Sequence, residues 1–243
     1  MFVTEPIESR YRVKQNYVRS LSGLLLLTIA ALASSRAQAA GGSHIVDDAE
    51  VETPGVCHIE GWVTRFVPGE GYYNAAPACT LKSLPMVEIG ANFQHYWDQT
   101  INAPLFGPAM KVNFRSETTG VGIGLGLNGG VNVRTGDLGT ASLLMLVTLP
   151  LDDKVKFNFN AGWSYLRGDT PDALFYGAQV EAKVGWDISL MLEIFGRTPG
   201  LAGTQLGLRY TPGDGPVDID LLAGSFLDSN APRFFTVGVT VRF

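Results

Sequence analysis

Apolar and polar residues alternate along most of this chain from about residue 57 onward. Between residues 154 and 166, positions 155, 157, 159, 161, 163 and 165 are apolar or aromatic, and the positions between them are Lys, Asn, Gly or Ser. The last stretch, RFFTVGVTVRF (233–243), repeats the pattern with Val237, Val239 and Val241 on one face. A period of two indicates a β-strand with one apolar and one polar face. The sequence therefore predicts an all-β protein.

The predicted strands are long and are separated by turns rich in Gly, Asp, Asn, Pro, Ser or Thr. They have about 10 to 13 residues, roughly twice an ordinary strand. That length matches the roughly 9 to 11 residues that cross a bilayer at a slant. Ten strands are clear, near residues 84–98, 108–116, 120–133, 140–151, 154–166, 173–184, 186–197, 203–211, 216–227 and 233–243.

Two weaker stretches, 57–67 and 71–80, precede these ten strands and decide the strand count. Single-chain bacterial barrels have an even number of strands, so the count is twelve with both stretches and ten with neither. Twelve is preferred, with Pro77 as the main argument against it. A hairpin of the two stretches would bring Cys57 and Cys79 together at the periplasmic mouth, and in an oxidising compartment they would form a disulfide. Two free buried thiols are the alternative.

A soluble β-sandwich is the other fold that this alternation allows. A sandwich would have shorter strands and more surface charge. Aromatic residues also gather near the strand ends, as interfacial girdles would require. They are Trp97, Tyr165, Tyr176, Trp186, Tyr210, Phe235 and Phe243. Strand length and girdles together predict a transmembrane, antiparallel, up-and-down β-barrel.

Composition agrees with a membrane protein. Of the 243 residues, 46% are hydrophobic and 17% charged, against about 25% charged in an ordinary soluble protein. The net charge is −5 without a basic block, which argues against a nucleic-acid partner.

The N-terminus has the pattern of an export signal. Basic residues between positions 10 and 19 precede an apolar stretch, Leu21–Ala33, and an Ala37-Gln38-Ala39 site. The stretch is shorter than the roughly 20 residues of a spanning helix, although an N-terminal anchor is the alternative. We expect a signal peptide at 1–39, cleaved before Ala40, a flexible, acidic periplasmic leader at 40–56 and a barrel at 57–243. The expected location is the outer membrane of a Gram-negative bacterium.

Several short motifs resemble a known family. Asp47 to Glu50 (DDAE) is followed by GVCHIEGWVTRF (55–66) and by PAC (77–79), and LEIFGR (192–197) comes later. This order resembles an uncharacterised family of proteobacterial outer-membrane barrels, with an acidic DDA, a Cys, Glu and Trp close together, and a second Cys. The resemblance implies a loosely transporter-like barrel and brings no substrate or catalytic residue with it.

Alternation also predicts which polar side chains face the lumen. The inward positions are Glu60, Glu88, Gln94, Lys111, Arg115, Lys156, Gln179, Glu181, Lys183, Asp187, Glu193, Arg197, Arg209, Asp218, Asp220 and Arg242. Both signs of charge occur and neither dominates. Opposite charges could pair across neighbouring strands, or the lining could pass small hydrophilic solutes. Glycines 122, 124 and 126 leave space inside for a facing side chain or for water.

Catalytic and cofactor chemistry find little support. Ser43 and His44 are adjacent but lie in the leader, and Asp169 and Asp172 are explained by turn geometry. The histidines at 44, 58 and 95 lack zinc-motif spacing. We therefore expect no enzyme, no metal and no cofactor.

The functional prediction is a passive channel or transporter for a small solute. A barrel plugged by its own side chains, with a structural or surface-interaction role, is the alternative, and a lipid-modifying enzyme is the weakest reading. The expected partners are outer-membrane lipids and the barrel assembly machinery, for which the terminal Phe243 resembles the recognition signal.

Overall fold

The computed structural model describes residues 43–67, 69–97, 102–168, 171–228 and 232–243. The predicted signal peptide (1–39) and its cleavage site before Ala40 lie outside these residues. Within the described ranges no helix has the length and apolarity needed to cross a membrane. In chain order the elements are β1 (Cys57–Phe66), β2 (Gly71–Thr80), β3 (Val87–Trp97), β4 (Asn102–Arg115), the 3₁₀ turn η1 (Glu117–Thr119), β5 (Gly122–Asn132), β6 (Leu138–Pro150), β7 (Val155–Leu166), β8 (Asp172–Gly185), β9 (Ile188–Thr198), β10 (Ala202–Tyr210), η2 (Pro212–Asp214), β11 (Val217–Phe226) and β12 (Arg233–Arg242).

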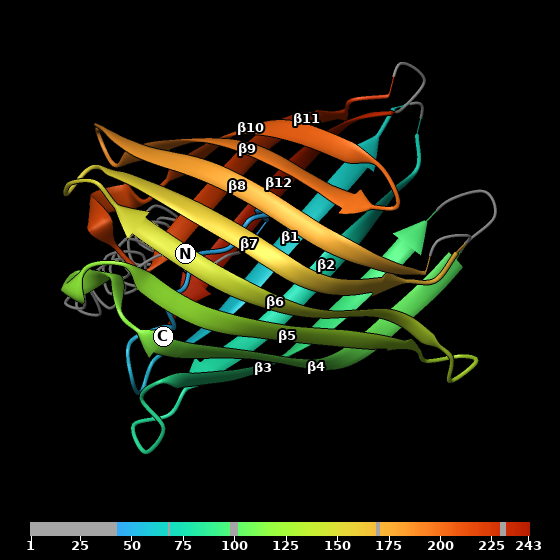
Figure 1. Ribbon diagram of the computed structural model, residues 1–243, viewed down its shortest axis with the longest axis horizontal. Helices are drawn as coiled ribbons and strands as arrows, with labels where there is room; N and C mark the ends of the chain where they lie inside the picture. The colour runs from blue at the N-terminus through green and yellow to red at the C-terminus, as the bar shows by residue number, and fades with distance from the viewer. Residues whose placement is uncertain (1–42, 68, 98–101, 169–170, 229–231) are drawn as a thin grey trace, which may run out of the picture. The chain divides into compact units, whose positions relative to one another are not determined.

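The twelve strands form one closed antiparallel barrel. Every strand pairs with its neighbours in sequence, and β1 closes the barrel by pairing with β12 from His58↔Arg242 to Phe66↔Phe234. Figure 1 shows the strands running at a slant around the barrel. The preferred count of twelve is confirmed, and the soluble sandwich is excluded because the sheet closes on itself.

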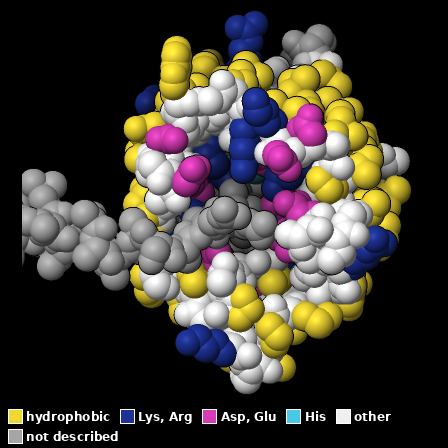
Figure 2. Space-filling view, turned by 90° about the vertical axis from the view of Figure 1, so that its left-hand side faces the viewer, with side chains coloured by type: hydrophobic (Ala, Val, Ile, Leu, Met, Phe, Trp, Pro, Cys, Tyr) yellow, Lys and Arg dark blue, Asp and Glu magenta, His cyan; other side chains and the backbone are white. Residues whose placement is uncertain are grey.

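Side chains alternate between the outside and the lumen, as the sequence pattern predicts. On β12, Val237, Val239 and Val241 are exposed on the outer surface, while Thr236 and Thr240 are buried inside. Figure 2 looks onto one end of the barrel, where hydrophobic side chains form the outer rim and charged side chains gather toward the middle. An apolar outside and a polar inside are the arrangement of a barrel that spans a lipid bilayer.

We call the end of the barrel where β1 begins and β12 stops the terminal end. The opposite end is the distal end. At the terminal end Cys57 and Cys79 form the predicted disulfide, in directly paired positions of β1 and β2. The backbones of Cys57 and Phe243 exchange two hydrogen bonds, of 3.0 and 2.8 Å. Both features tie the first strand to its two neighbours.

Two strands differ from simple expectation because they contain proline. β4 begins at Asn102 rather than near 108, since Pro104 and Pro108 stay in register with β3 although neither donates a ladder hydrogen bond. In β2 the pairing with β3 is interrupted between Ala75 and Ala78, where Pro77 lies. Continuous pairing of β2 with β1, and of β4 with β3, maintains the sheet.

Candidate functional site

The lumen contains part of the chain itself. Residues 43–52, here called the lumenal segment, run inside the barrel before β1 begins. Val46 and Ala49 are almost completely buried, and so are the acidic side chains of Asp48, Glu50 and Glu52. For residues 43–52 the structure thus differs from the expectation of a flexible periplasmic leader at 40–56, of which residues 40–42 lie outside the described ranges. The wall supplies partners for this segment that lie far away in sequence.

Glu193 of β9 holds the start of the segment. Its carboxylate accepts the backbone N–H groups of Ile45 and Val46 at 3.0 and 3.1 Å, and it lies 2.6 Å from Nδ1 of His44. The hydroxyl of Ser43 donates to Asp220 of β11 at 3.0 Å. Ser43 and His44 are therefore each engaged with a carboxylate of the wall.

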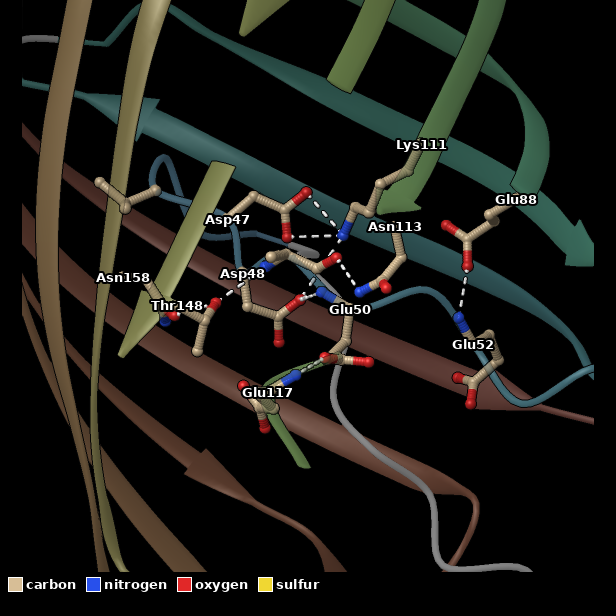
Figure 3. Close-up of polar contacts among 12 residues, drawn as sticks. Asp47, Asp48, Glu50, Glu52, Glu88, Lys111, Asn113, Glu117, Thr148 and Asn158 are labelled. Atoms are coloured by element: carbon tan, nitrogen blue, oxygen red, sulfur yellow. Dashed lines mark hydrogen bonds and ion pairs between the residues drawn. The ribbon is translucent and has the colours of Figure 1, made fainter. Parts of the chain in front are cut away.

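Lysines from the wall neutralise the middle of the segment, and Figure 3 shows one of them, Lys111, beside Asp47. Lys111 of β4 lies 2.8 Å from Asp47, and Lys156 of β7 lies 3.1 Å from Asp48. The backbone that follows these two aspartates is also bound, because Ala49 donates its N–H to Thr148 at 2.9 Å. Its carbonyl accepts from Asn113 at 2.7 Å. Charge-assisted and backbone hydrogen bonds of this kind fix both position and direction.

Acidic residues continue to the end of the segment. Glu50 accepts the backbone N–H of Glu117 in η1, and the N–H of Glu52 donates to Glu88 at 2.9 Å (Figure 3). The side chain of Glu52 lies 2.7 Å from Arg242, which also binds Asp218 of β11 at 2.7 Å. The penultimate residue of the chain is thereby bound to the residues just before β1.

Glycines on four strands let the segment approach the wall. A Cβ on Gly177 would lie 2.7 Å from Val46, and one on Gly238 would lie 2.8 Å from Ser43. The corresponding distances are 3.0 Å from Gly207 to His44 and 3.0 Å from Gly124 to the carbonyl oxygen of Ala49. Side chains at these positions would displace the segment. For Gly124 this decides which of the two expected uses of the glycine row applies: it faces another part of the chain.

Aromatic side chains cover the segment toward the distal end. Val46 packs with Phe195 and Phe234, and Ile45, Phe66, Phe175 and Phe226 surround this cluster. Phe195, Phe226 and Phe234 lie at the distal ends of β9, β11 and β12 and contact one another edge-on or tilted, with ring centroids 5.7 to 6.4 Å apart. Apolar packing therefore fills this side of the lumen.

The opposite side of the lumen is hollow. A cavity of about 270 Å³ lies between the segment and strands β1 to β7. Small residues open it, since Ala76, Ala78, Gly90 and Gly126 line its wall. Its polar lining consists of His44, Asp47, His58, Glu60, Glu88, Asn92, Lys111, Asn128, Ser142 and Asn160.

Most of the charged residues expected in the lumen are buried there. Those buried are Glu60, Glu88, Lys111, Glu181, Glu193, Arg209, Asp218, Asp220 and Arg242, and Lys156 and Arg197 are half-buried. Arg115, Lys183 and Asp187 lie at or just beyond strand ends and are exposed. Pairing between strands is extensive: Arg209 lies 2.7 Å from Asp220, and Lys156 lies 3.6 Å from Glu181.

The balance of charge inside the barrel differs from the sequence expectation that neither sign dominates. Nine acidic residues are buried in the described part of the chain, against three lysines and arginines. Half of this excess comes from the lumenal segment, which contributes Asp48, Glu50 and Glu52 and was expected to lie outside the barrel. The available signal was the acidic run DDAEVE directly before the first strand, in a chain otherwise short of charge.

Two ionisable groups of the segment are perturbed by this setting. Burial lowers the pKa of His44, but the carboxylates of Asp220 and Glu193 raise it further, to about 9. Burial alone would raise the pKa of Asp48, but Lys156 and Lys111 outweigh it and hold the pKa below its usual value. His44 is thus an imidazolium and Asp48 a carboxylate at neutral pH. Among the described residues, no group of three His, Cys, Asp or Glu side chains is placed to hold a metal ion.

A family model described as "Uncharacterised conserved protein UCP029691" matches residues 28–243. The chain belongs to this family. This confirms the resemblance to an uncharacterised family of barrels that the sequence motifs indicated. No curated protein matches the chain.

Two solved structures with the same fold are a porin and an outer membrane channel. The KdgM porin in complex with disordered oligogalacturonate has a TM-score of 0.61 and 11% identity, over 76% of this chain and 99% of that one. The COG4313 outer membrane channel from Pseudomonas putida F1 has a TM-score of 0.55 and 8% identity, over 85% of this chain and 100% of that one. At these identities the likeness concerns the fold.

Proposed function

We propose that this protein is an outer-membrane channel through which small polar solutes diffuse passively, along the side of the lumen that the lumenal segment leaves open. The proposal includes export by the N-terminal signal peptide and insertion with the terminal end in the periplasm. It also includes recognition of Phe243, an exposed terminal aromatic residue, by the barrel assembly machinery.

The cavity of about 270 Å³ carries the proposal. It lies inside a closed barrel with an apolar exterior, and its wall includes amide, hydroxyl and charged side chains. Such groups can replace part of the water around a small polar solute, so the solute can enter and leave at moderate cost. A fully occluded core would have needed large side chains at Ala76, Ala78 and Gly90.

The similar solved structures support a channel, although they do not identify its solute. The KdgM porin was solved with oligogalacturonate, a carboxylated sugar chain. Here the buried charges are mostly acidic, which would repel an anionic solute. We therefore propose small neutral or cationic solutes instead, and no catalytic step.

A plugged barrel with a structural role is the second candidate, and the hydrogen bonds of the lumenal segment favour it. Val46, Ala49 and Glu52 each donate a backbone N–H to a wall side chain. If the segment and its cavity are closed to ions, the barrel is an anchor or surface protein.

Conductance of the purified protein in planar lipid bilayers separates the two candidates. The channel proposal predicts discrete openings in KCl. Ser142→Trp, on the cavity side of β6, should reduce the single-channel conductance by about half or more because the indole fills the passage. Leu143→Trp is the matched control, since the adjacent residue is exposed on the outer surface, and its conductance should be unchanged.

Two results would contradict the proposal. The absence of openings at every voltage would favour the plugged barrel. Equal conductance of the Ser142→Trp and Leu143→Trp proteins would show that solutes do not pass through this cavity.

A further inference from the structure

Two of the three acidic residues that line the cavity, Glu60 and Glu88, have no basic partner. Asp47, Asp48, Asp218 and Asp220 each lie within 4.0 Å of a lysine or arginine. No described lysine or arginine lies within that distance of Glu60 or Glu88, as the ion pairs of the described residues show. The cavity therefore has two carboxyl groups in its wall that no lysine or arginine pairs with.

Glu60 is also unpartnered in its hydrogen bonding. Its side chain lines the cavity, only 8% of the residue is exposed, and within the described chain its carboxylate accepts no hydrogen bond. Nε2 of His58 lies 3.7 Å from this carboxylate, beyond hydrogen-bond distance. A buried carboxylate without a donor is costly unless something in the cavity compensates it.

His58 provides a second observation at the same place. It is 3% exposed and lines the cavity, and its Nδ1 has no hydrogen-bond partner. Glu52 and Glu60 flank its ring at 4.0 and 3.7 Å. This imidazole is therefore surrounded by carboxylates and separates Glu60 from the Glu52–Arg242 pair.

The wall between Glu60 and Glu88 leaves room for a ligand. Glu60 of β1 pairs with Ala76 of β2, and Glu88 of β3 lies one strand further along, near Ala78 and Gly90. Glu88 uses one carboxylate oxygen to accept from Glu52 and Thr80, so its other oxygen remains for the cavity. The volume of about 270 Å³ equals roughly nine water molecules, enough for a cation that keeps part of its hydration shell.

We propose that Glu60 and Glu88 form a binding site for small monovalent cations on the β1–β4 side of the lumen, and that this site makes the channel select cations over anions. The inference rests on the proposed channel function and adds its solute class. Carboxylates in a narrow polar passage attract cations, and the low dielectric of the surrounding wall strengthens that attraction. The two carboxylates would repel an anion in the same cavity. Lys111 would not offset this repulsion, because it is bound to Asp47 and Asp48.

The test is the reversal potential of the wild-type protein in a planar bilayer with a concentration gradient of KCl, repeated with ethylammonium chloride. Both salts should give a cation-to-anion permeability ratio above one. Glu60→Gln should lower that ratio by a factor of about two to ten, and Glu60→Gln/Glu88→Gln should lower it further. Asp153→Asn is the matched control, because it removes the same charge from the exposed β6–β7 turn, and it should leave the ratio unchanged.

The wild-type measurement requires no substitution and therefore tests the proposal even if a variant fails to fold. Heat-dependent gel mobility reports whether each variant forms the barrel. A ratio at or below one in either salt would overturn the cation site while leaving the channel function standing. A ratio above one that is the same in Glu60→Gln/Glu88→Gln would assign the selectivity to other residues and also overturn the site. The absence of any current would overturn the channel and this inference together.

Discussion

At the scale of single residues, the lumenal segment is held by carboxylates that serve several partners at once. Glu193 binds His44, two backbone N–H groups and the amides of Gln179 and Gln205. Asp220 binds Arg209 and Ser43. Because each carboxylate is buried and bound on several sides, its removal would leave unpaired groups on both the segment and the wall.

His44 should make the docking of the segment depend on pH. The docked pKa of His44 is about 9, above its ordinary value near 6.5. Protonated His44 thus contributes docking free energy, roughly 3 kcal/mol, that is fully present below about pH 6.5 and is lost as pH rises through about 9. The charged groups around it are Glu193, Asp220 and Arg209. Single-channel conductance should therefore rise between about pH 7 and pH 10.

The matched variant is His44→Gln, which keeps a hydrogen-bond donor but has no charge to lose. It should conduct more than the wild type at neutral pH, and its conductance should change little across the same range. Parallel pH profiles for the two proteins would show that His44 does not control the segment.

Residue-scale prediction from sequence succeeded where alternation alone decides the direction of a side chain. Glu193 and Arg242 face the lumen as expected. Arg115 and Lys183 lie at strand ends, and their side chains are exposed at the mouth of the barrel although alternation assigns them to the inner face. The binding partners of these residues could not be predicted from sequence, because they are far apart in the chain: Arg242 and Glu52 are separated by 190 positions.

At the scale of elements, the strands followed from local pattern, but the lumenal segment did not. Twelve strands and the Cys57–Cys79 disulfide were predictable because period-two alternation, strand parity and hairpin geometry are local rules. The segment has no periodicity, and its conformation is imposed by strands that follow it in sequence. An acidic stretch before the first strand is typical of a solvated leader when it is considered alone. Its docked conformation depends on lysines and glycines of the surrounding wall.

Gly177 of β8 is the most direct test of this packing between segment and wall. In Gly177→Ala the new methyl group would lie 2.7 Å from Val46, so docking should weaken by about 1 to 3 kcal/mol. The segment should become more susceptible to limited proteolysis, and the channel should conduct more. Gly61→Ala is the control, since the nearest atom to its new methyl group is 3.8 Å away.

Unchanged protease sensitivity in Gly177→Ala would contradict the close packing. Equal effects of Gly177→Ala and Gly61→Ala would instead indicate a general weakening of the strands.

At the scale of the whole molecule, the barrel is divided along its length. One side of the lumen is filled by the lumenal segment and the phenylalanine cluster around Val46. The other side holds the cavity, with Glu60 and Glu88 in its wall. The barrel itself could be predicted from strand length and amphipathicity, whereas this division depends on contacts between residues 43–52 and most of the strands. The segment thereby narrows the lumen and adds to the excess of buried acidic residues inside the barrel.

The measurement that tests this account most directly is the single-channel conductance of the protein with and without residues 43–52, at neutral pH in KCl. Removing the segment should leave the twelve-strand barrel in place, because closure depends on β1 and β12. It should also raise the conductance by about two- to fivefold, since the lumen is then open on both sides. A correctly inserted deletion protein with the conductance of the intact chain would contradict the central claim that the segment occupies the pore.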